Sequence, residues 1–258
     1  SQREILGACQ VIYFSPEDLD LVRGEPTNRR DFLDKLLITK TPRLAGVLND
    51  YDRVLKQRNT LLRTRAPQSA IAPWTDQLIN FASVITAERI ALVEALNPLV
   101  AANYQELNEV KTAAIIYKSN IEGLSTNPEA NQQLISAKIS EVQYQEVERG
   151  VTLVGPHRDD LVLQLGEFPA KGYASHGESW SFAISLKIGA LELLKSEGLD
   201  PILILDDVFA ELDTNRRARL VQATKLAEQT IVTAAVEGDL PTDLSDFRLY
   251  VSNGGVTK

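Results

Sequence analysis

Two adjacent carboxylates, Asp206 and Asp207, stand at the end of an apolar run that extends from Pro201 to Leu205. A short run of branched apolar residues predicts a strand buried in the centre of a parallel sheet. Ligands of open α/β sheets bind at the carboxyl ends of such strands, and two unpaired anions cannot be buried there without a large desolvation penalty. The pair therefore indicates a magnesium-nucleotide site, although two acids that cap the following helix would give the same pattern.

A second candidate site lies upstream, in the segment Ser175-His-Gly-Glu178. Residues 179–194 have apolar side chains at helical spacing, so a short glycine-containing loop opens a helix here. The bare backbone N–H groups of the loop, the positive end of the helix dipole and the Ser175 hydroxyl suit a phosphate oxygen. A serine N-cap with a glutamate three residues later is also an ordinary capping box, and the sequence does not separate the two interpretations.

A third acidic segment, Glu211-Leu-Asp213, follows the paired carboxylates and precedes a helix that begins near Thr214. The segment Gln229-Thr-Ile-Val-Thr-Ala-Ala235 predicts one more buried strand. The order of loop, helix, strand with two acids, acidic turn and strand resembles the second half of an ABC-type ATPase head. The expected fold class is therefore α/β, an ABC-ATPase-like (P-loop NTPase) head fragment with an inserted, mainly helical lobe.

Within that superfamily, the chain resembles the RecF family of bacterial recombination-repair proteins. The resemblance extends from about Phe14 to about Val236, and several independent motifs in the right order make it specific. It rests on the segments Phe14-Ser-Pro-Glu-Asp-Leu-Asp-Leu-Val22, Arg29-Arg-Asp-Phe-Leu-Asp34, Tyr51-Asp-Arg-Val-Leu-Lys-Gln-Arg-Asn59, Gly155-Pro-His-Arg-Asp-Asp160 and Ser175-His-Gly-Glu178.

The resemblance implies a role for each candidate site residue. It assigns Asp206 to the Walker B carboxylate, which holds magnesium largely through water, and Asp207 to the acid that orients or deprotonates the attacking water. Asp213 becomes the D-loop residue at the seam of a dimer. The signature loop, which contacts the ATP held by the opposite subunit, is assigned to Ser175, Gly177 and Glu178. These roles suit phosphoryl transfer, which needs charge neutralisation and positioned water more than covalent chemistry.

Two components of such an ATPase are missing from the sequence. No Gly-x-x-x-x-Gly-Lys-[Ser/Thr] segment is present, so tight autonomous binding of ATP is not expected. The family has this loop upstream of the segment that begins at Phe14, and the chain starts at a non-methionine Ser1, which predicts a carboxyl-terminal fragment. Many such ATPases also place a γ-phosphate-sensing histidine after the last strand, where this chain has Ala234, Ala235 and Val236.

The resemblance further implies the function of the whole protein. It would dimerise on ATP, bind gapped or junction DNA where single strands meet double strands, and release it on slow hydrolysis. It would help to load the recombinase onto single strands in DNA repair, replication restart and the SOS response, with recombination mediator proteins of the same pathway. ATP and magnesium are the implied cofactors of the full-length protein, whereas this chain alone is expected to be inactive.

Three regions are expected along the chain. Residues 1–26 would end the first lobe of the head, residues 27–150 would form the helical lobe, and residues 151–258 would contain the signature loop, Walker B strand and D-loop. Apolar stripes over residues 43–65 and 73–96 predict two helices that pack as an antiparallel pair. Pro98 is expected to kink or divide the second helical segment, and Val151-Thr-Leu-Val154 is expected to form a strand.

Composition sets the outer limits on localisation and partners. The chain has 258 residues, a formal net charge of −8 and a single cysteine, Cys9. One cysteine suits the cytosol, and no apolar run approaches the ~20 residues that span a bilayer, so a cytoplasmic protein without a membrane partner is expected. The negative charge argues against a surface that binds DNA everywhere.

Local basic density is nevertheless present, although a solvated helix face is the alternative interpretation of each cluster. The clusters are Arg23 with Arg29 and Arg30; Arg53, Lys56, Arg58, Arg63 and Arg65; and Arg216, Arg217 and Arg219.

Two other classes of function remain open at this point. The nucleotide-binding subunit of a transporter would share the signature loop and the paired acids, but would not be expected to carry a long helical insert. A non-enzymatic protein-interaction module built on the helical lobe would bind a partner whether or not Asp207 is present.

Overall fold

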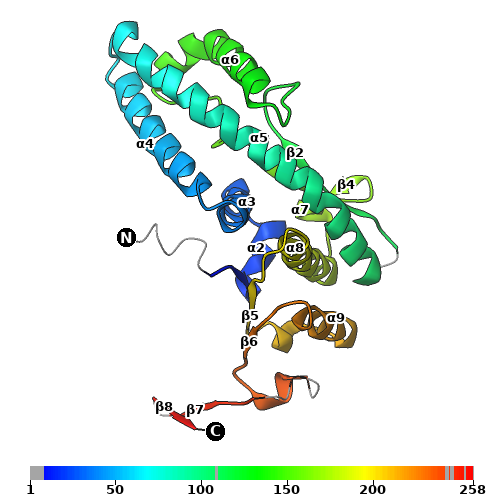
Figure 1. The fold of residues 1–258 in the computed structure, drawn as a ribbon. Helices are drawn as coiled ribbons and strands as arrows, with labels where there is room; N and C mark the ends of the chain where they lie inside the picture. The colour runs from blue at the N-terminus through cyan, green and yellow to red at the C-terminus, as the bar shows by residue number, and fades with distance from the viewer. Residues whose placement is uncertain (1–8, 108–109, 242–243, 245–246, 253, 258) are drawn as a thin grey trace.

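The computed structural model describes residues 9–107, 110–241, 244, 247–252 and 254–257, and Figure 1 shows their arrangement. Three parallel strands form a sheet in the order β1-β5-β6, with the bounds β1 (Val11–Phe14), β5 (Ile202–Asp206) and β6 (Thr230–Thr233). Asp206 lies opposite Thr233 in the register of β5 and β6. The predicted parallel sheet is therefore confirmed, and the carboxyl ends of its strands lie at one edge.

Helix α8 (His176–Ser196) packs on one face of this sheet, and α2 (Leu19–Arg23) and α9 (Thr214–Thr224) pack against α8. Helix α8 is apolar on most of its circumference and is buried accordingly, with Trp180 1% exposed and in edge contact with the Phe14 ring. Alternate residues of β1 point to the two faces of the sheet. Phe14 is fully buried toward α8, whereas Val11 and Tyr13 are 38% and 46% exposed.

A second region consists of long helices (Figure 1), with the bounds α3 (Pro26–Lys40), α4 (Leu44–Arg63), α5 (Gln68–Leu107) and α6 (Pro128–Arg149). A short turn joins α4 to α5, and the two helices lie side by side. Their apolar stripes meet in one buried cluster that contains Tyr51 and Val54 of α4 and Leu78, Ala82 and Ile85 of α5. The predicted antiparallel helix pair is confirmed.

Pro98 does not divide the second helical segment, so this part of the expectation that Pro98 would kink or divide it is wrong. Helix α5 runs through both Pro73 and Pro98 over 40 residues. A proline removes one helical hydrogen bond, but tertiary contacts offset the loss here. Leu96 and Val100, on either side of Pro98, are fully buried in the core shared with α8.

Val151–Val154 does not form a strand, which is a second correction. Side chains of the neighbouring helices satisfy the backbone of this segment instead. The Thr152 N–H donates to Asn59 Oδ1 at 2.7 Å, and the Leu153 N–H donates to Glu146 Oε1 at 2.7 Å. The sequence of an apolar segment looks the same whether its backbone N–H groups donate to a neighbouring strand or to side chains. The spacing of apolar residues therefore could not show that side chains bind this backbone.

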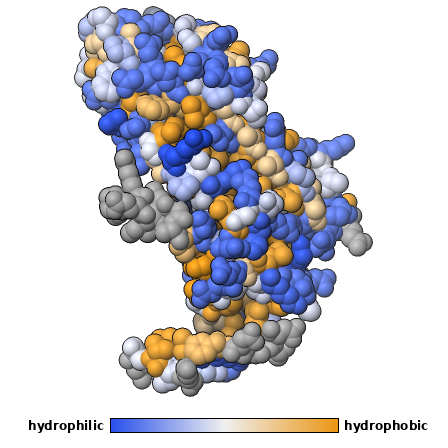
Figure 2. Space-filling model, in the orientation of Figure 1, coloured by the Kyte–Doolittle hydropathy of each residue, from blue (hydrophilic) through white to orange (hydrophobic). Residues whose placement is uncertain are grey.

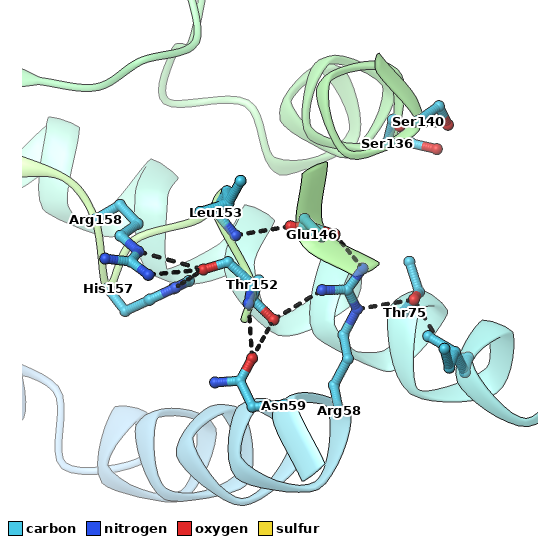
Figure 3. A network of polar contacts seen from close by, with 11 residues as sticks. Arg58, Asn59, Thr75, Ser136, Ser140, Glu146, Thr152, Leu153, His157 and Arg158 are labelled. Atoms are coloured by element: carbon cyan, nitrogen blue, oxygen red, sulfur yellow. Dashed lines mark hydrogen bonds and ion pairs between the residues drawn. The ribbon is translucent and has the colours of Figure 1, made fainter. Parts of the chain in front are cut away.

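A buried ion pair between Arg58 of α4 and Glu146 of α6 lies at the centre of these contacts (Figure 3). The two side chains are 2% and 0% exposed, and Arg58 Nη2 donates to Glu146 Oε2 at 2.6 Å. Arg58 also donates through Nε to Thr75 Oγ1 and through Nη1 to Thr152 Oγ1. The guanidinium therefore joins α4, α5, α6 and the segment after α6.

The remaining strands form an antiparallel sheet and a hairpin. The sheet has the order β2-β3-β4, followed by a short helix, with the bounds β2 (Ala113–Lys118), β3 (Asp160–Leu165), β4 (Phe168–Pro169) and α7 (Ala170–Tyr173). The hairpin consists of β7 (Tyr250–Ser252) and β8 (Gly255–Thr257), where exposed apolar side chains gather at the lower end of the molecule in Figure 2. Single-turn 3₁₀ helices complete the fold: η1 (Pro16–Asp18), η2 (Phe209–Glu211) and η3 (Glu237–Asp239).

Two hydrophobic clusters share helix α5. Its first half packs with α4 and α6, and its second half packs with α3, α8 and the strands. The division at residues 27 and 151 stays a prediction, and residues 1–8 of its first region lie outside the described part of the chain. Within the described residues, no helix has the length and apolar character needed to cross a membrane.

Candidate functional site

Asp206 is the last residue of β5, and each of its carboxylate oxygens accepts a hydrogen bond from a hydroxyl group. Tyr13 of β1 donates to Oδ2, and Thr233 of β6 donates to Oδ1. The Thr233 bond and then the Tyr13 bond hold the pKa of Asp206 below its ordinary value, while the same contact raises the pKa of the Tyr13 hydroxyl. Asp206 is therefore an oriented anion, and it keeps free lone pairs because two carboxylate oxygens accept about four hydrogen bonds.

Asp207 occupies a left-handed backbone conformation, with φ of 54°. Aspartate tolerates this region better than most residues. Its N–H donates to the Thr233 carbonyl at 3.2 Å, and its Oδ1 accepts from the Ala235 N–H at 3.3 Å. The helix-capping interpretation of the acid pair is wrong, because Val208 occupies the N-cap position of η2.

Ala235 is one of the three residues, with Ala234 and Val236, at which the sequence lacks the expected histidine. It has no side-chain hydrogen-bonding group, but its backbone N–H reaches Asp207.

The predicted loop at Ser175 opens α8 as a complete capping box. Ser175 Oγ accepts from the Glu178 N–H at 3.2 Å, and Glu178 Oε2 accepts from the Ser175 N–H at 2.8 Å. The other oxygen of Glu178 accepts from Lys111 Nζ at 2.6 Å. The Lys111 contact, followed by the Ser175 backbone bond, lowers the pKa of the Glu178 carboxyl. The loop is therefore fixed as an N-cap, with its acid ionised.

Asp213 caps the next helix, α9. Its Oδ1 accepts from the Arg216 N–H at 2.9 Å, and its Oδ2 pairs with the Arg216 guanidinium. Arg216 Nε in turn donates to Ser181 Oγ of α8 at 2.9 Å. The turn that contains Asp213 is thereby tied to the helix that the Ser175 loop opens.

The predicted site residues fall into two groups. Asp206 and Asp207 lie at the sheet edge, and the Ser175 loop lies against the segment that contains Glu211 and Asp213. His176 Nε2 is 4.0 Å from Glu211 Oε2. Residues 208–210 connect Asp207 to Glu211, so one short segment separates the two groups along the chain.

The donor set at the sheet edge suits magnesium held through water. Within the part of the chain that the structure describes, no group of three metal-ligating side chains occurs. Magnesium usually keeps several waters and binds through one or two carboxylates plus substrate phosphates. The hydroxyls on both Asp206 oxygens favour this outer-sphere contact, because a metal-bound water can donate to a remaining lone pair.

Sequence reasoning missed several residues of the two groups. Tyr13 and Thr233 could have been found from the predicted topology, because the ends of neighbouring parallel strands meet at one edge. The contacts of Lys111 and Arg216 had no signal in the sequence, since they join positions 67 and 35 residues apart.

The basic clusters are less available to DNA than their spacing indicated. Arg58 is buried with Glu146, and Arg29 Nε donates to Asp160 Oδ1 at 2.8 Å. Arg216 is engaged by Asp213. By contrast, Arg53 is 70% exposed in a pair with Asp50. Density of arginine along a sequence does not predict a basic surface when the guanidinium groups are used internally.

The arrangement of sheet, capped helix and paired acids is that of an ABC-type ATPase head. The chain matches a structure of the recombination mediator protein RecF with ATPrS over 99% of its length and 69% of that chain, with a TM-score of 0.88 at 24% identity. A structure of RecF with ATP gives a TM-score of 0.84 at 25% identity, over 98% of this chain and 68% of that one. Both belong to the RecFOR pathway.

Sequence similarity defines the family more narrowly. The chain is 46% identical to the DNA replication and repair protein RecF of Streptomyces avermitilis and 45% identical to that of Frankia alni. Each comparison covers 99% of this chain and 72% of the relative. The chain matches no model of a protein family. It belongs to the RecF family of DNA replication and repair proteins.

Proposed function

We propose that the chain forms the signature and Walker B part of the ATPase head, with the helical lobe, of an ATP-dependent DNA-binding repair protein. The observation that supports this most is the sheet edge, where oriented, anionic Asp206 adjoins Asp207 at the end of the central parallel strand. Ligands of open α/β sheets bind there. Membership in the RecF family favours this function over a transporter subunit.

The proposed roles are those that the family resemblance implies, and the geometry of each residue is compatible with its role. Asp206 holds magnesium through water, and Asp207, turned aside by its left-handed backbone, orients or deprotonates the attacking water. Ser175 Oγ accepts the Glu178 N–H, which leaves its own hydrogen for a phosphate oxygen at the start of α8. Gly177 and Glu178 complete this signature loop, which receives the ATP held by a second copy, and Asp213 lies at the seam.

The wider proposal concerns the full-length protein. The 258 residues contain no Gly-x-x-x-x-Gly-Lys-[Ser/Thr] loop, and we propose that this loop lies in a segment upstream of residue 1. The full-length protein then dimerises on ATP in the cytoplasm and binds gapped or junction DNA. With mediator proteins of the same pathway, it loads the recombinase onto single strands.

The test measures ATP-dependent dimerisation and ATP turnover of the full-length protein carrying Ser175→Arg or Asp207→Asn. Asparagine suits the backbone of residue 207, because it also tolerates positive φ. Asp207→Asn is expected to lower turnover by about 100-fold or more and to lengthen the life of the dimer, since general-base steps contribute about 10²–10⁴-fold. Ser175→Arg is expected to abolish dimerisation.

Glu228→Gln is the matched control, because Glu228 is exposed in the turn before β6, at the opposite end of the strand from Thr233. It should leave both measurements unchanged. If the Ser175 and Asp207 variants behave like the Glu228 variant, the ATPase function is refuted. Partner binding that persists unchanged in all three variants would then favour a protein-interaction module.

A further inference from the structure

Arg216 of α9 touches both of the elements that the proposed function places at the dimer seam. Its guanidinium pairs with Asp213, which caps α9, and its Nε donates to the buried Ser181 of α8 at 2.9 Å. A Cβ placed on Gly177 would lie 2.9 Å from Arg216 Nη2. One side chain therefore contacts the Asp213 turn, the Gly177 backbone and the second turn of α8.

Helical periodicity explains how a single arginine covers these two positions of α8. Gly177 and Ser181 are four residues apart, so they lie on the same face of the helix. The glycine leaves room for the planar guanidinium, and the serine supplies an acceptor one turn further on. Arg216 is 18% exposed, whereas its partner Asp213 is 54% exposed. The Arg216 side chain is thus largely buried, whereas the Asp213 carboxylate at the other end of the ion pair is accessible at the surface.

A second arginine holds the same turn of α8 from another element. Arg23 of α2 donates through Nε to Ser179 Oγ at 3.1 Å, and its Nη2 lies 3.1 Å from His176 Nδ1. Glu178 is held by Lys111. The first turns of α8 are therefore fixed by three cations from α2, α9 and the segment before β2, and Arg216 alone among them also contacts Asp213.

We propose that Arg216 is a positioning residue that couples the Asp213 turn to the Ser175 loop. When a second copy contacts the exposed carboxylate of Asp213, Arg216 transmits the displacement to Gly177 and Ser181, which aligns the start of α8 for phosphate. Gly177 is then required to accommodate Arg216 as well as to approach the nucleotide. This inference rests on the proposed function and deepens it.

A double-mutant cycle tests the geometry independently of ATP. Gly177→Ala in the wild-type chain gains helix propensity but displaces the guanidinium from Asp213 and Ser181, so the Tm is expected to stay level or fall. In an Arg216→Ala background the clash is gone, and Gly177→Ala is expected to raise the Tm. The difference between the two backgrounds should be about 2–4 °C. Equal shifts in both backgrounds would refute the contact.

The coupling is tested in the full-length protein by ATP turnover and dimer lifetime. Arg216→Ala is expected to lower kcat about 10-fold and to shorten the dimer lifetime, with the nucleotide affinity of the monomer within about 2-fold, because only alignment is lost. Arg216→Lys should restore stability more than kcat, since an ammonium cannot reproduce the planar fork. Gln222→Ala is the control, because Gln222 is exposed in the last turn of α9 and lies outside the Asp213 turn.

The outcomes separate this inference from the proposed function. If Asp207→Asn abolishes turnover while Arg216→Ala matches Gln222→Ala, the coupling role is refuted and the ATPase function stands. If Asp207→Asn also changes nothing, the proposed function itself is refuted. Loss of monomer affinity in Arg216→Ala would likewise overturn the positioning role, because it would indicate direct binding of the nucleotide.

Discussion

Removal of the buried Arg58 guanidinium is expected to destabilise the helical lobe severely. Arg58→Ala leaves the Glu146 carboxylate, which is 0% exposed, with the Leu153 N–H but without its cation. Removing one partner of a buried ion pair typically costs about 3–5 kcal/mol. For a chain of this size each kcal/mol shifts the Tm by about 2–4 °C, so a fall of about 6–20 °C is expected.

The same helix offers a matched control. Arg53 pairs with Asp50 at 3.0 Å, but the two side chains are 70% and 42% exposed. An exposed pair contributes about 0–1 kcal/mol, so Arg53→Ala should barely change the midpoint of urea unfolding followed by far-ultraviolet circular dichroism.

A third variant separates charge from packing. The double change Arg58→Met with Glu146→Gln removes both charges, keeps most of the volume and retains an oxygen that accepts from the Leu153 N–H, so it should regain more than half of the stability lost in Arg58→Ala. If Arg58→Ala and Arg53→Ala unfold at the same urea concentration, the buried pair does not stabilise the lobe and the reasoning fails.

Three further predictions concern other contacts. Burial lowers the pKa of His157 to about 4, so the unfolded chain takes up a proton before the folded chain does as the pH falls from about 6.5. The free energy of unfolding should therefore drop by about 2–3 kcal/mol between about pH 6.5 and pH 4. The urea midpoint of His157→Gln should not show this dependence on pH. Gly150→Ala should lower the free energy of unfolding in urea by about 1–2 kcal/mol, because φ of Gly150 is 65° and a Cβ would lie 3.0 Å from the Arg63 side chain. Gly46→Ala is the control: a Cβ there meets no other atom, and the change should stabilise α4 by about 0.5–1 kcal/mol. Equal effects of the two changes would contradict this prediction. Lys111→Met should raise the pKa of Glu178 in an NMR titration, and an unchanged pKa would show that the ion pair does not form in solution.

Local spacing predicted the elements that depend on near neighbours in the chain. A serine and a glutamate three residues apart can satisfy each other's backbone N–H groups only at a helix start, and Ser175 and Glu178 form this capping box. A short branched apolar run favours a buried strand, and Asp206 accordingly ends β5. The paired acids therefore stand at the sheet edge for reasons contained within a few residues.

Hydrogen-bond partners far apart in the sequence were decided only by the tertiary structure. The segment 151–154 is apolar enough for a strand, but Asn59 and Glu146 supply its backbone partners from two helices. Pro98 would end an isolated helix, yet buried contacts around Leu96 and Val100 keep α5 continuous. Sequence patterns record which groups need a partner, whereas packing decides which partner each one meets.

The candidate site shows the same division. The sequence by itself determined that Asp206, Asp207 and the Ser175 loop end a strand and open a helix. Only the tertiary structure decided that Thr233 and Tyr13 orient Asp206, and that Arg216 joins Asp213 to α8. The physical reason is that side-chain hydrogen bonds act over about 3 Å, and such proximity between remote residues exists only after the chain has folded.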